Sequence, residues 1–139
     1  MEYPTVFPAL SYDDASAAVD FLTAAFGAER HALYTGDRGV VRHAELRFGN
    51  GLVMFGSAHA DAPAPRGKGG SIYITVTDPD ALCEQARQAG AEIVREPYDT
   101  DYGSREFGAK DPEGNSWNFG TYQPFEFDHA AEEAKSASA

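Results

Sequence analysis

The sequence predicts an α+β fold made of two paired βαβββ modules, and three observations support this prediction. The order strand, helix, three strands occurs twice along the 139-residue chain. A shift of 64 positions places Asp14 on Asp78, and Phe55-Gly56 on Phe119-Gly120. The segment DPEGN at 111–115 combines a proline that presets one backbone angle with a glycine that accepts positive φ, which predicts a turn between two aromatic-rich strands. Because this period is too long for a solenoid repeat, we expect two modules whose sheets pack together around a shared cavity.

The first module is expected to open with a strand from Val6 to Tyr12. Pro8 interrupts it and cannot donate to a ladder, so this strand should lie at a sheet edge. Asp13-Asp14 supplies a helix cap, and the periodicity of the apolar residues predicts a helix over Ala15–Phe26 that ends at Gly27. Three more strands are expected at Glu29–Tyr34, Val40–Phe48 and Leu52–Ser57. Asn50-Gly51 predicts a two-residue turn between the last two.

The second module follows a segment rich in Ala, Pro and Gly at His59–Gly70, which predicts an exposed linker. A strand is expected over Ser71–Val76, and then a helix capped by Asp78 with Pro79 as its first residue. The remaining strands are expected at Glu92–Tyr98, Arg105–Lys110 and Ser116–Tyr122. One domain therefore covers 1–123, with modules at 5–58 and 71–122 joined by a linker at 59–70, and residues 124–139 form a C-terminal tail.

Composition limits the class of partner. The net charge is −11, and the hydrophobic fraction of 42% is ordinary for a globular protein. Nucleic acid is disfavoured because a phosphate-binding surface needs clustered Lys and Arg, whereas a cationic ligand is compatible with the charge. No apolar run approaches the roughly 20 residues that span a bilayer, and the N-terminus lacks a signal-peptide pattern. With Cys83 as the single cysteine, we expect a cytoplasmic protein that binds neither membrane nor nucleic acid.

The sequence resembles the vicinal oxygen chelate superfamily, which includes glyoxalase I, bleomycin-resistance proteins and extradiol dioxygenases. The resemblance covers roughly residues 5–123. It depends most on YGSREFGAKDPEGNSWNFGTY at 102–122 and DDASAAVDFLTAAFG at 13–27. It implies a cup-shaped mixed sheet with helices on the outside. It also implies a homodimer, since family members commonly complete their cavities with residues of a second subunit. The fold hosts unrelated functions, so it names no activity.

The resemblance also locates the positions of metal ligands. Metal-dependent members carry four ligands, usually two His and two Glu, on the first and last strands of each module. In this sequence the corresponding residues are Phe7, Met54, Ser71 and Asn118. Catalytic metals need at least three imidazole, carboxylate or thiolate ligands, so we expect no metal and no cofactor here. A relocated site at His43 and Glu45 stays open, although a solvated polar face suits their spacing better.

The expected cavity is apolar and aromatic with a few hydroxyl and amide groups, which suits an organic ligand. Alternation along the last strand directs Asn118 into the cavity, with Trp117 and Phe119 under the helices. The 64-residue shift makes Arg42 and Glu106 equivalent, so they either pair across the cup or grip a ligand. The predicted ligand-binding residues are Phe7, Arg42, Met54, Ser71, Tyr73, Tyr102, Glu106, Asn118 and Tyr122. No catalytic residue is assigned.

Three functions are compatible with these residues. The missing metal ligands favour a non-catalytic binding protein, closest to the metal-less bleomycin-resistance-like branch, which sequesters a cationic or aromatic organic molecule such as an antibiotic. The alternative is a glyoxalase- or dioxygenase-like enzyme, a lyase, isomerase or oxygenase. It would have a relocated metal or a metal-free acid/base site that uses Glu106 or Tyr73. The third is a small regulatory or structural dimer with a vestigial cavity.

Overall fold

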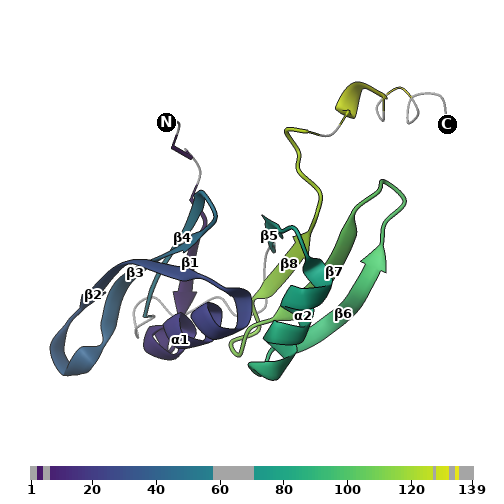
Figure 1. Cartoon of the computed structure of the whole chain (residues 1–139). Helices are drawn as coiled ribbons and strands as arrows, with labels where there is room; N and C mark the ends of the chain where they lie inside the picture. The colour runs from purple at the N-terminus through teal and green to yellow at the C-terminus, as the bar shows by residue number, and fades with distance from the viewer. Residues whose placement is uncertain (1–2, 5–6, 58–70, 127, 132–133, 135–139) are drawn as a thin grey trace.

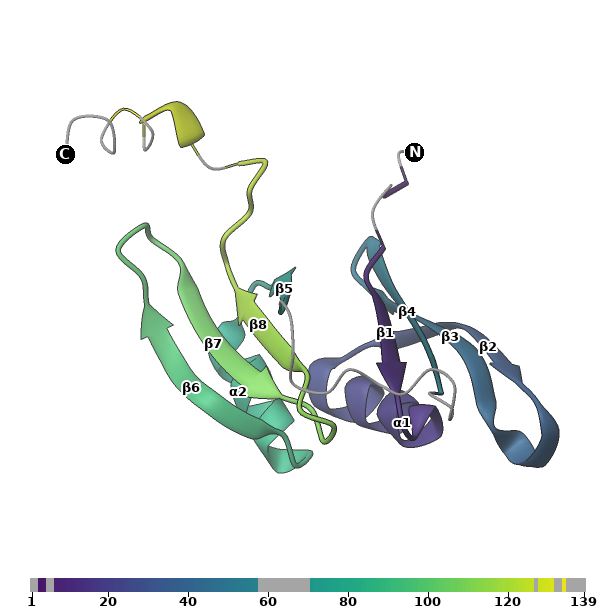
Figure 2. The ribbon, with the colours of Figure 1, turned by 180° about the vertical axis from the view of Figure 1, so that it is seen from behind.

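The computed structural model describes residues 3–4, 7–57, 71–126, 128–131 and 134, and it contains two four-stranded mixed sheets (Figures 1 and 2). The first module comprises β1 (Ala9–Tyr12), α1 (Ala15–Phe26), β2 (Glu29–Thr35), the 3₁₀ helix η1 (Asp37–Gly39), β3 (Val41–Phe48) and β4 (Gly51–Ser57). The second comprises β5 (Ile72–Thr75), α2 (Pro79–Gln88), β6 (Glu92–Asp99), β7 (Arg105–Lys110) and β8 (Ser116–Gly120). The predicted fold class is confirmed.

Both sheets have the same topology. Their strand orders are β1-β4-β3-β2 and β5-β8-β7-β6, with the first strand of each module parallel to the last. The strand β1 therefore lies at an edge, as Pro8 predicts, and the Pro8 carbonyl accepts a hydrogen bond from the Met54 amide at 3.0 Å. The repeat in the sequence is thus a repeat of topology.

The helix ends follow the capping residues in the sequence. The Asp14 carboxylate accepts a hydrogen bond from the Ala17 amide at 3.0 Å, and the Asp78 carboxylate accepts one from the Ala81 amide at 3.1 Å. Pro79 occupies the first turn of α2, where its missing amide hydrogen costs nothing. Gly27 ends α1 in the left-handed conformation at φ 75°, which a side chain would disfavour.

Two local details differ from the prediction. The turn between β3 and β4 consists of Gly49 and Asn50, one residue earlier than expected, because Phe48 pairs with Gly51 and Gly49 takes a φ of 59°. Because Asn50 has a glycine on each side, the sequence is compatible with a two-residue turn at either Gly49-Asn50 or Asn50-Gly51. The 3₁₀ helix η1 has no expected counterpart. The predicted linker at 59–70 lies outside the described residues.

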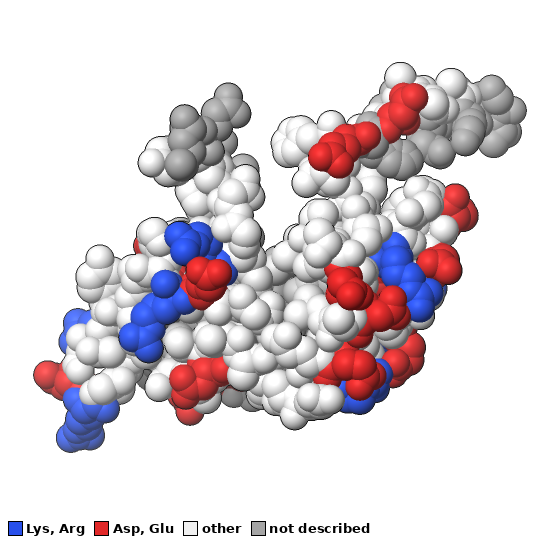
Figure 3. All heavy atoms as spheres, viewed as in Figure 1, with Lys and Arg blue, Asp and Glu red and all other residues white. Residues whose placement is uncertain are grey.

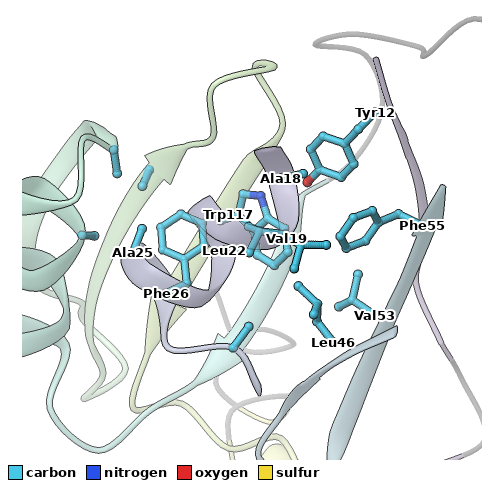
Figure 4. Close-up of a cluster of buried hydrophobic side chains, with 14 of the residues drawn as sticks. Tyr12, Ala18, Val19, Leu22, Ala25, Phe26, Leu46, Val53, Phe55 and Trp117 are labelled. Atoms are coloured by element: carbon cyan, nitrogen blue, oxygen red, sulfur yellow. The ribbon is translucent and has the colours of Figure 1, made fainter. Parts of the chain in front are cut away.

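A single hydrophobic core joins the modules through α1, which lies between the first sheet and Trp117 of β8 (Figure 4). The Phe26 ring lies 5.4 Å from the Trp117 ring and 4.8 Å from the Phe119 ring, between centroids. On its other side α1 packs Leu22 and Val19 toward Phe55 of β4. Trp117 is 0% exposed, so it belongs to the core, as alternation along the last strand predicts.

Side chains of the turn at 111–115 form hydrogen bonds with the segment that joins β1 to α1. The buried Asp111 carboxylate accepts hydrogen bonds from the Tyr12 hydroxyl at 2.6 Å and the Trp117 indole at 3.1 Å. It also accepts the backbone amides of Glu113 and Asn115. Burial, followed by this hydrogen bond, raises the pKa of Tyr12. The Glu113 carboxylate in turn accepts the amides of the two residues that directly precede α1. The segment that carries the family resemblance therefore has a structural role.

On the face seen in Figure 3, Lys and Arg side chains lie beside Asp and Glu in mixed groups. On the second module Arg87 pairs with Glu84 and Glu96, and Arg105 pairs with Asp80. Exposed pairs of this kind add little stability. None of the helices in the described part of the chain has the length and apolar character needed to cross a membrane.

Candidate functional site

Each sheet has one face covered by its helix and one open face. In the second sheet Tyr73 pairs with Asn118, and Glu106 pairs with Gly120, all pointing away from α2. The intervening residues Ile72, Ile74 and Phe119 pack into the core instead. The side chains that point away from α2, together with those at the edge of the sheet, form what we call the second open face. Its residues are Tyr73, Tyr98, Tyr102, Glu106, Asn118 and Tyr122.

Glu106 is the centre of this face. The residue is 7% exposed. Its Oε2 atom accepts the hydroxyls of Tyr73 and Ser104, each at 2.9 Å. Its Oε1 atom accepts the Tyr98 hydroxyl at 3.3 Å, and the Tyr102 hydroxyl lies 3.1 and 3.2 Å from the two oxygens. A buried charge is costly unless it is paired or hydrogen-bonded, and here hydroxyl donors stabilise it. We call these five residues the Glu106 cluster.

Gly120 makes this cluster possible. A Cβ atom at this position would lie 2.5 Å from Glu106 Cγ and would also meet the Tyr73 hydroxyl, so any larger residue would push the two apart. Burial raises the pKa of Tyr73 to about 12, with the Glu106 carboxylate adding to the rise. Burial, together with the hydrogen bond to Glu106, also raises the pKa of Tyr102. Both phenols therefore stay protonated and donate at neutral pH.

Aromatic rings surround the mouth of the cluster. The Tyr122 ring lies edge-on to the rings of Tyr73 and Tyr102, with centroid distances of 6.2 and 5.7 Å. A hollow of about 170 Å³ beside them is lined in part by Tyr102, Ser104, Tyr122 and Glu126. The face thus combines a fixed carboxylate with flat apolar surface.

The first sheet offers a different open face. A cavity of about 710 Å³ is lined by apolar side chains that include Phe7 and Met54, and by polar ones that include His31 and Glu45. His43 Nε2 lies 2.9 Å from one Glu45 oxygen, and His31 Nε2 lies 4.0 Å from the other. Within the described ranges, no group of three or more His, Cys, Asp or Glu side chains is placed to hold a metal ion.

A third cavity, of about 640 Å³, lies between the modules, beside the β3–β4 turn and β5. Tyr73 is the one predicted ligand-binding residue among those that line it. Tyr73 is thus a residue common to the wall of this cavity and to the second open face.

The structure brings together five of the nine predicted site residues. Tyr73, Tyr102, Glu106 and Tyr122 contact one another, and Asn118 is the strand partner of Tyr73. Phe7, two residues before β1, and Met54 of β4 line the same cavity. Ser71 is exposed and directly precedes β5.

The predicted equivalence of Arg42 and Glu106 is wrong. Ala44 pairs with Phe55 as Phe107 pairs with Phe119, so the counterpart of Glu106 is His43. The loop at 111–115 is one residue longer than the matching connection between β3 and β4. The offset between equivalent residues of the two modules is therefore 64 positions after this loop, in β4 and β8, but 63 positions before it, in β3 and β7.

Arg42 also leaves the open face of its own sheet. Tyr34 pairs with His43 and Thr35 pairs with Val41, which leaves Arg42 as the extra residue of a β-bulge. Its side chain packs over Gly36. Arg42 and Glu106 therefore lie on different sheets.

Tyr98 and Ser104 are the members of the Glu106 cluster that the sequence analysis missed. Two register shifts in β6 offset each other, so Tyr98 lies on the same face as Glu92, opposite Glu106. Its place in the cluster depends on the pairing of β6 with β7, which alternation along one strand does not give. Ser104 could have been found, because it lies two residues before Glu106 and thus points the same way.

The comparison with known proteins agrees with this architecture. The sequence profile of the Glyoxalase/Bleomycin resistance protein/Dioxygenase superfamily matches residues 6–119. The chain belongs to this superfamily. A relative in Mycobacterium bovis, the uncharacterized protein Mb0911c, is 35% identical over 128 residues, which cover 84% of this chain and 82% of the relative.

Solved structures show the same fold in proteins with different names. TioX from Micromonospora sp. ML1 has a TM-score of 0.73 at 28% identity, covering 88% of this chain and 100% of that one. Glyoxalase I from Zea mays has a TM-score of 0.71 at 23% identity, and the match covers 84% of this chain but 43% of the maize protein. Family membership therefore leaves the activity to be argued from the site.

Proposed function

We propose that this protein binds a small organic molecule, such as an antibiotic, without transforming it, as a member of the metal-less bleomycin-resistance-like branch. One observation supports this proposal above the others. The positions at which metal-dependent relatives carry ligands hold Phe7, Met54, Ser71 and Asn118. Two of these, Phe7 and Met54, supply apolar surface to a cavity of about 710 Å³, which is a suitable size for a drug-like ligand.

The two open faces supply the other features of a ligand site. The first provides apolar surface, and the second provides phenol rings with a carboxylate and an amide. Flat rings offer large contact area, and a few polar groups fix the orientation of a ligand. Phe7, Met54, Tyr73, Tyr102, Glu106, Asn118 and Tyr122 are the residues that we propose contact the ligand. Ser71, which lies two residues before Tyr73 at the start of β5, stays in the proposed site. Arg42 lies at the β-bulge of the first sheet with its side chain over Gly36, so we propose no direct contact for it.

We also propose that the active form is a cytoplasmic homodimer. Within one chain the two open faces belong to separate sheets. A second copy placed against them would enclose a ligand between two faces and bury more of its surface. The expected solution mass is therefore that of two chains, which light scattering would measure.

Ligand binding is tested by thermal shift against a panel of aromatic and peptide antibiotics. A ligand that binds the folded protein raises its melting temperature in proportion to the logarithm of its concentration above the Kd. A flat response across a broad panel would contradict the proposal. So would stoichiometric zinc, nickel, iron or manganese in the purified protein.

A metal-free acid/base enzyme is the second candidate, and one contact favours it. His43 Nε2 lies 2.9 Å from the Glu45 carboxylate, which can orient the imidazole as a base. Glu45 also lines the cavity of about 710 Å³. If this pair transfers protons, ligands that bind the protein will be converted, and His43→Gln will abolish conversion while leaving affinity intact. Mass spectrometry of the ligand after incubation separates the two candidates.

A further inference from the structure

Glu45 presents one free acceptor oxygen to the cavity of about 710 Å³ on the first sheet. Its Oε2 atom lies 2.9 Å from His43 Nε2. Its Oε1 atom has no hydrogen-bond donor among the described residues, and His31 Nε2 lies 4.0 Å from it, which is too long for a hydrogen bond. The Glu45 side chain is 25% exposed, and Glu45 and His31 both line the cavity. Oε1 can therefore accept a hydrogen bond from a bound molecule.

His31 reaches this cavity because β2 contains a β-bulge. Arg30 pairs with Leu46 of β3. Ala32 pairs with the next residue back along β3, Glu45, so His31 is the extra residue between two paired positions. In an unbroken strand His31 would point away from the face that Ala32 shares with Glu45, since neighbouring side chains alternate. The bulge therefore adds an imidazole to the open face, beside the Glu45 carboxylate.

The charged groups in the wall of this cavity are balanced. The Arg47 guanidinium lies 3.0 Å from the Glu29 carboxylate, and both residues line the cavity. Glu45 faces the imidazoles of His31 and His43. An anionic ligand would be repelled by the two carboxylates, whereas a cationic one would meet the guanidinium of Arg47 and the two imidazoles. The wall therefore favours a neutral polar group.

A hydroxyl group matches the pair formed by His31 and Glu45. One oxygen atom can lie about 2.8 Å from both His31 Nε2 and Glu45 Oε1, because these two atoms are 4.0 Å apart. A hydroxyl donates one hydrogen and also accepts, so it can donate to the carboxylate and accept the N–H of an imidazole protonated at Nε2. An ammonium group only donates and a methyl ether only accepts, so neither bonds to both partners.

Apolar surface lies directly beside this pair. Met54 is the strand partner of Glu45 across β3 and β4, so their side chains are neighbours on one face, about 5 Å apart at Cβ. Phe7 and Leu52 line the same cavity. A thioether packs favourably against an aromatic ring. A ring attached to the hydroxyl would therefore lie on Met54.

We infer that this cavity binds a neutral hydroxylated aromatic molecule. Its hydroxyl bridges Glu45 Oε1 and His31 Nε2, and its ring lies against Met54. The inference rests on the proposed binding function and names its ligand class, phenols and related hydroxyarenes, with His31 and Glu45 as the residues that determine specificity. Methylation of the hydroxyl removes the charge-assisted hydrogen bond to Glu45 and weakens binding.

The test uses a matched pair of probes, p-cresol and 4-methylanisole, titrated into the isotopically labelled full chain and followed by NMR. We expect p-cresol to bind about tenfold more tightly than its methyl ether, since a hydrogen bond to a charged group contributes at least that much. Glu45→Ala should remove this preference. Glu29→Ala removes a carboxylate of the same cavity that Arg47 already holds, so it should preserve the preference.

Each result decides the inference. Equal binding of the two probes overturns it, as does a preference that Glu45→Ala leaves intact or Glu29→Ala abolishes. If Glu45→Ala fails to fold, His31→Ala decides, because this side chain is 48% exposed and its loss must reduce the preference. Probe-induced shifts confined to amides of the second sheet, or no binding of p-cresol at millimolar concentration, also overturn it. The antibiotic panel separately decides whether the protein binds organic ligands at all.

Discussion

Replacing Asp111 with alanine tests the structural role assigned to the turn at 111–115. The carboxylate is 4% exposed and accepts the Tyr12 hydroxyl and the Trp117 indole, whose residues are 1% and 0% exposed. The substitution leaves both donors in the core without an acceptor, and it also removes two hydrogen bonds within the turn. Each unsatisfied buried donor costs about 1–3 kcal/mol, so the expected loss is about 3–5 kcal/mol.

A loss of this size is a large part of the 5–15 kcal/mol that typically stabilises a domain. Urea unfolding followed by circular dichroism should show a much lower midpoint with an unchanged slope. Asp101→Ala, at an exposed position of a different turn, is the matched control and should change stability by less than about 0.5 kcal/mol.

A double-mutant cycle locates the effect. Tyr12→Phe removes one of the two donors that Asp111→Ala leaves without an acceptor. Its loss of stability should therefore be smaller in the Asp111→Ala background than in the wild type, with a coupling free energy of about 1–3 kcal/mol. Additive losses, or a loss below about 1 kcal/mol for Asp111→Ala, would refute the reasoning.

Three further predictions concern the site and the core. Gly120→Ala should destabilise the protein by about 1–3 kcal/mol in urea unfolding, since its Cβ would lie 2.5 Å from Glu106 Cγ; an unchanged midpoint would contradict the close packing of the cluster. Tyr73 has its pKa raised from 10.0 to about 12, so its contribution to stability is present below pH 10 and lost as pH rises toward 12. Tyr73→Phe should therefore lose less stability than the wild type between pH 10 and 12, and parallel losses would count against this. Trp117 is fully buried, so its fluorescence should resist acrylamide quenching and stay unchanged when ligand binds; ready quenching would place it in the cavity instead.

Local sequence signals predict much of the fold because their causes are local. Asp14, Asp78 and Pro79 fix the helix starts, and the caps form as expected. Trp117 could be assigned to the core because alternation along an unbroken strand relates it to its neighbours. These inferences need no knowledge of the partner strands.

The site could be predicted only in part because β-bulges change strand register. Arg42 is the extra residue of such a bulge, which turns it away from the face that simple alternation predicts. Two register shifts precede Tyr98 and offset each other, so its partner on β7 could not be read from β6 alone. The hydrogen bonds of Glu106 join β5, β6, β7 and the loop before β7, so they depend on pairing between distant segments. Glu106 itself could be named from the sequence, but its burial among phenols could not.

The central claim is that the protein binds an organic ligand and leaves it unchanged. The most direct measurement is to incubate the tightest binder of the panel with stoichiometric protein and analyse the ligand by mass spectrometry alongside its calorimetric affinity. We expect saturable binding, with the ligand recovered intact after long incubation. Conversion of the ligand into a product would contradict it and favour the acid/base enzyme.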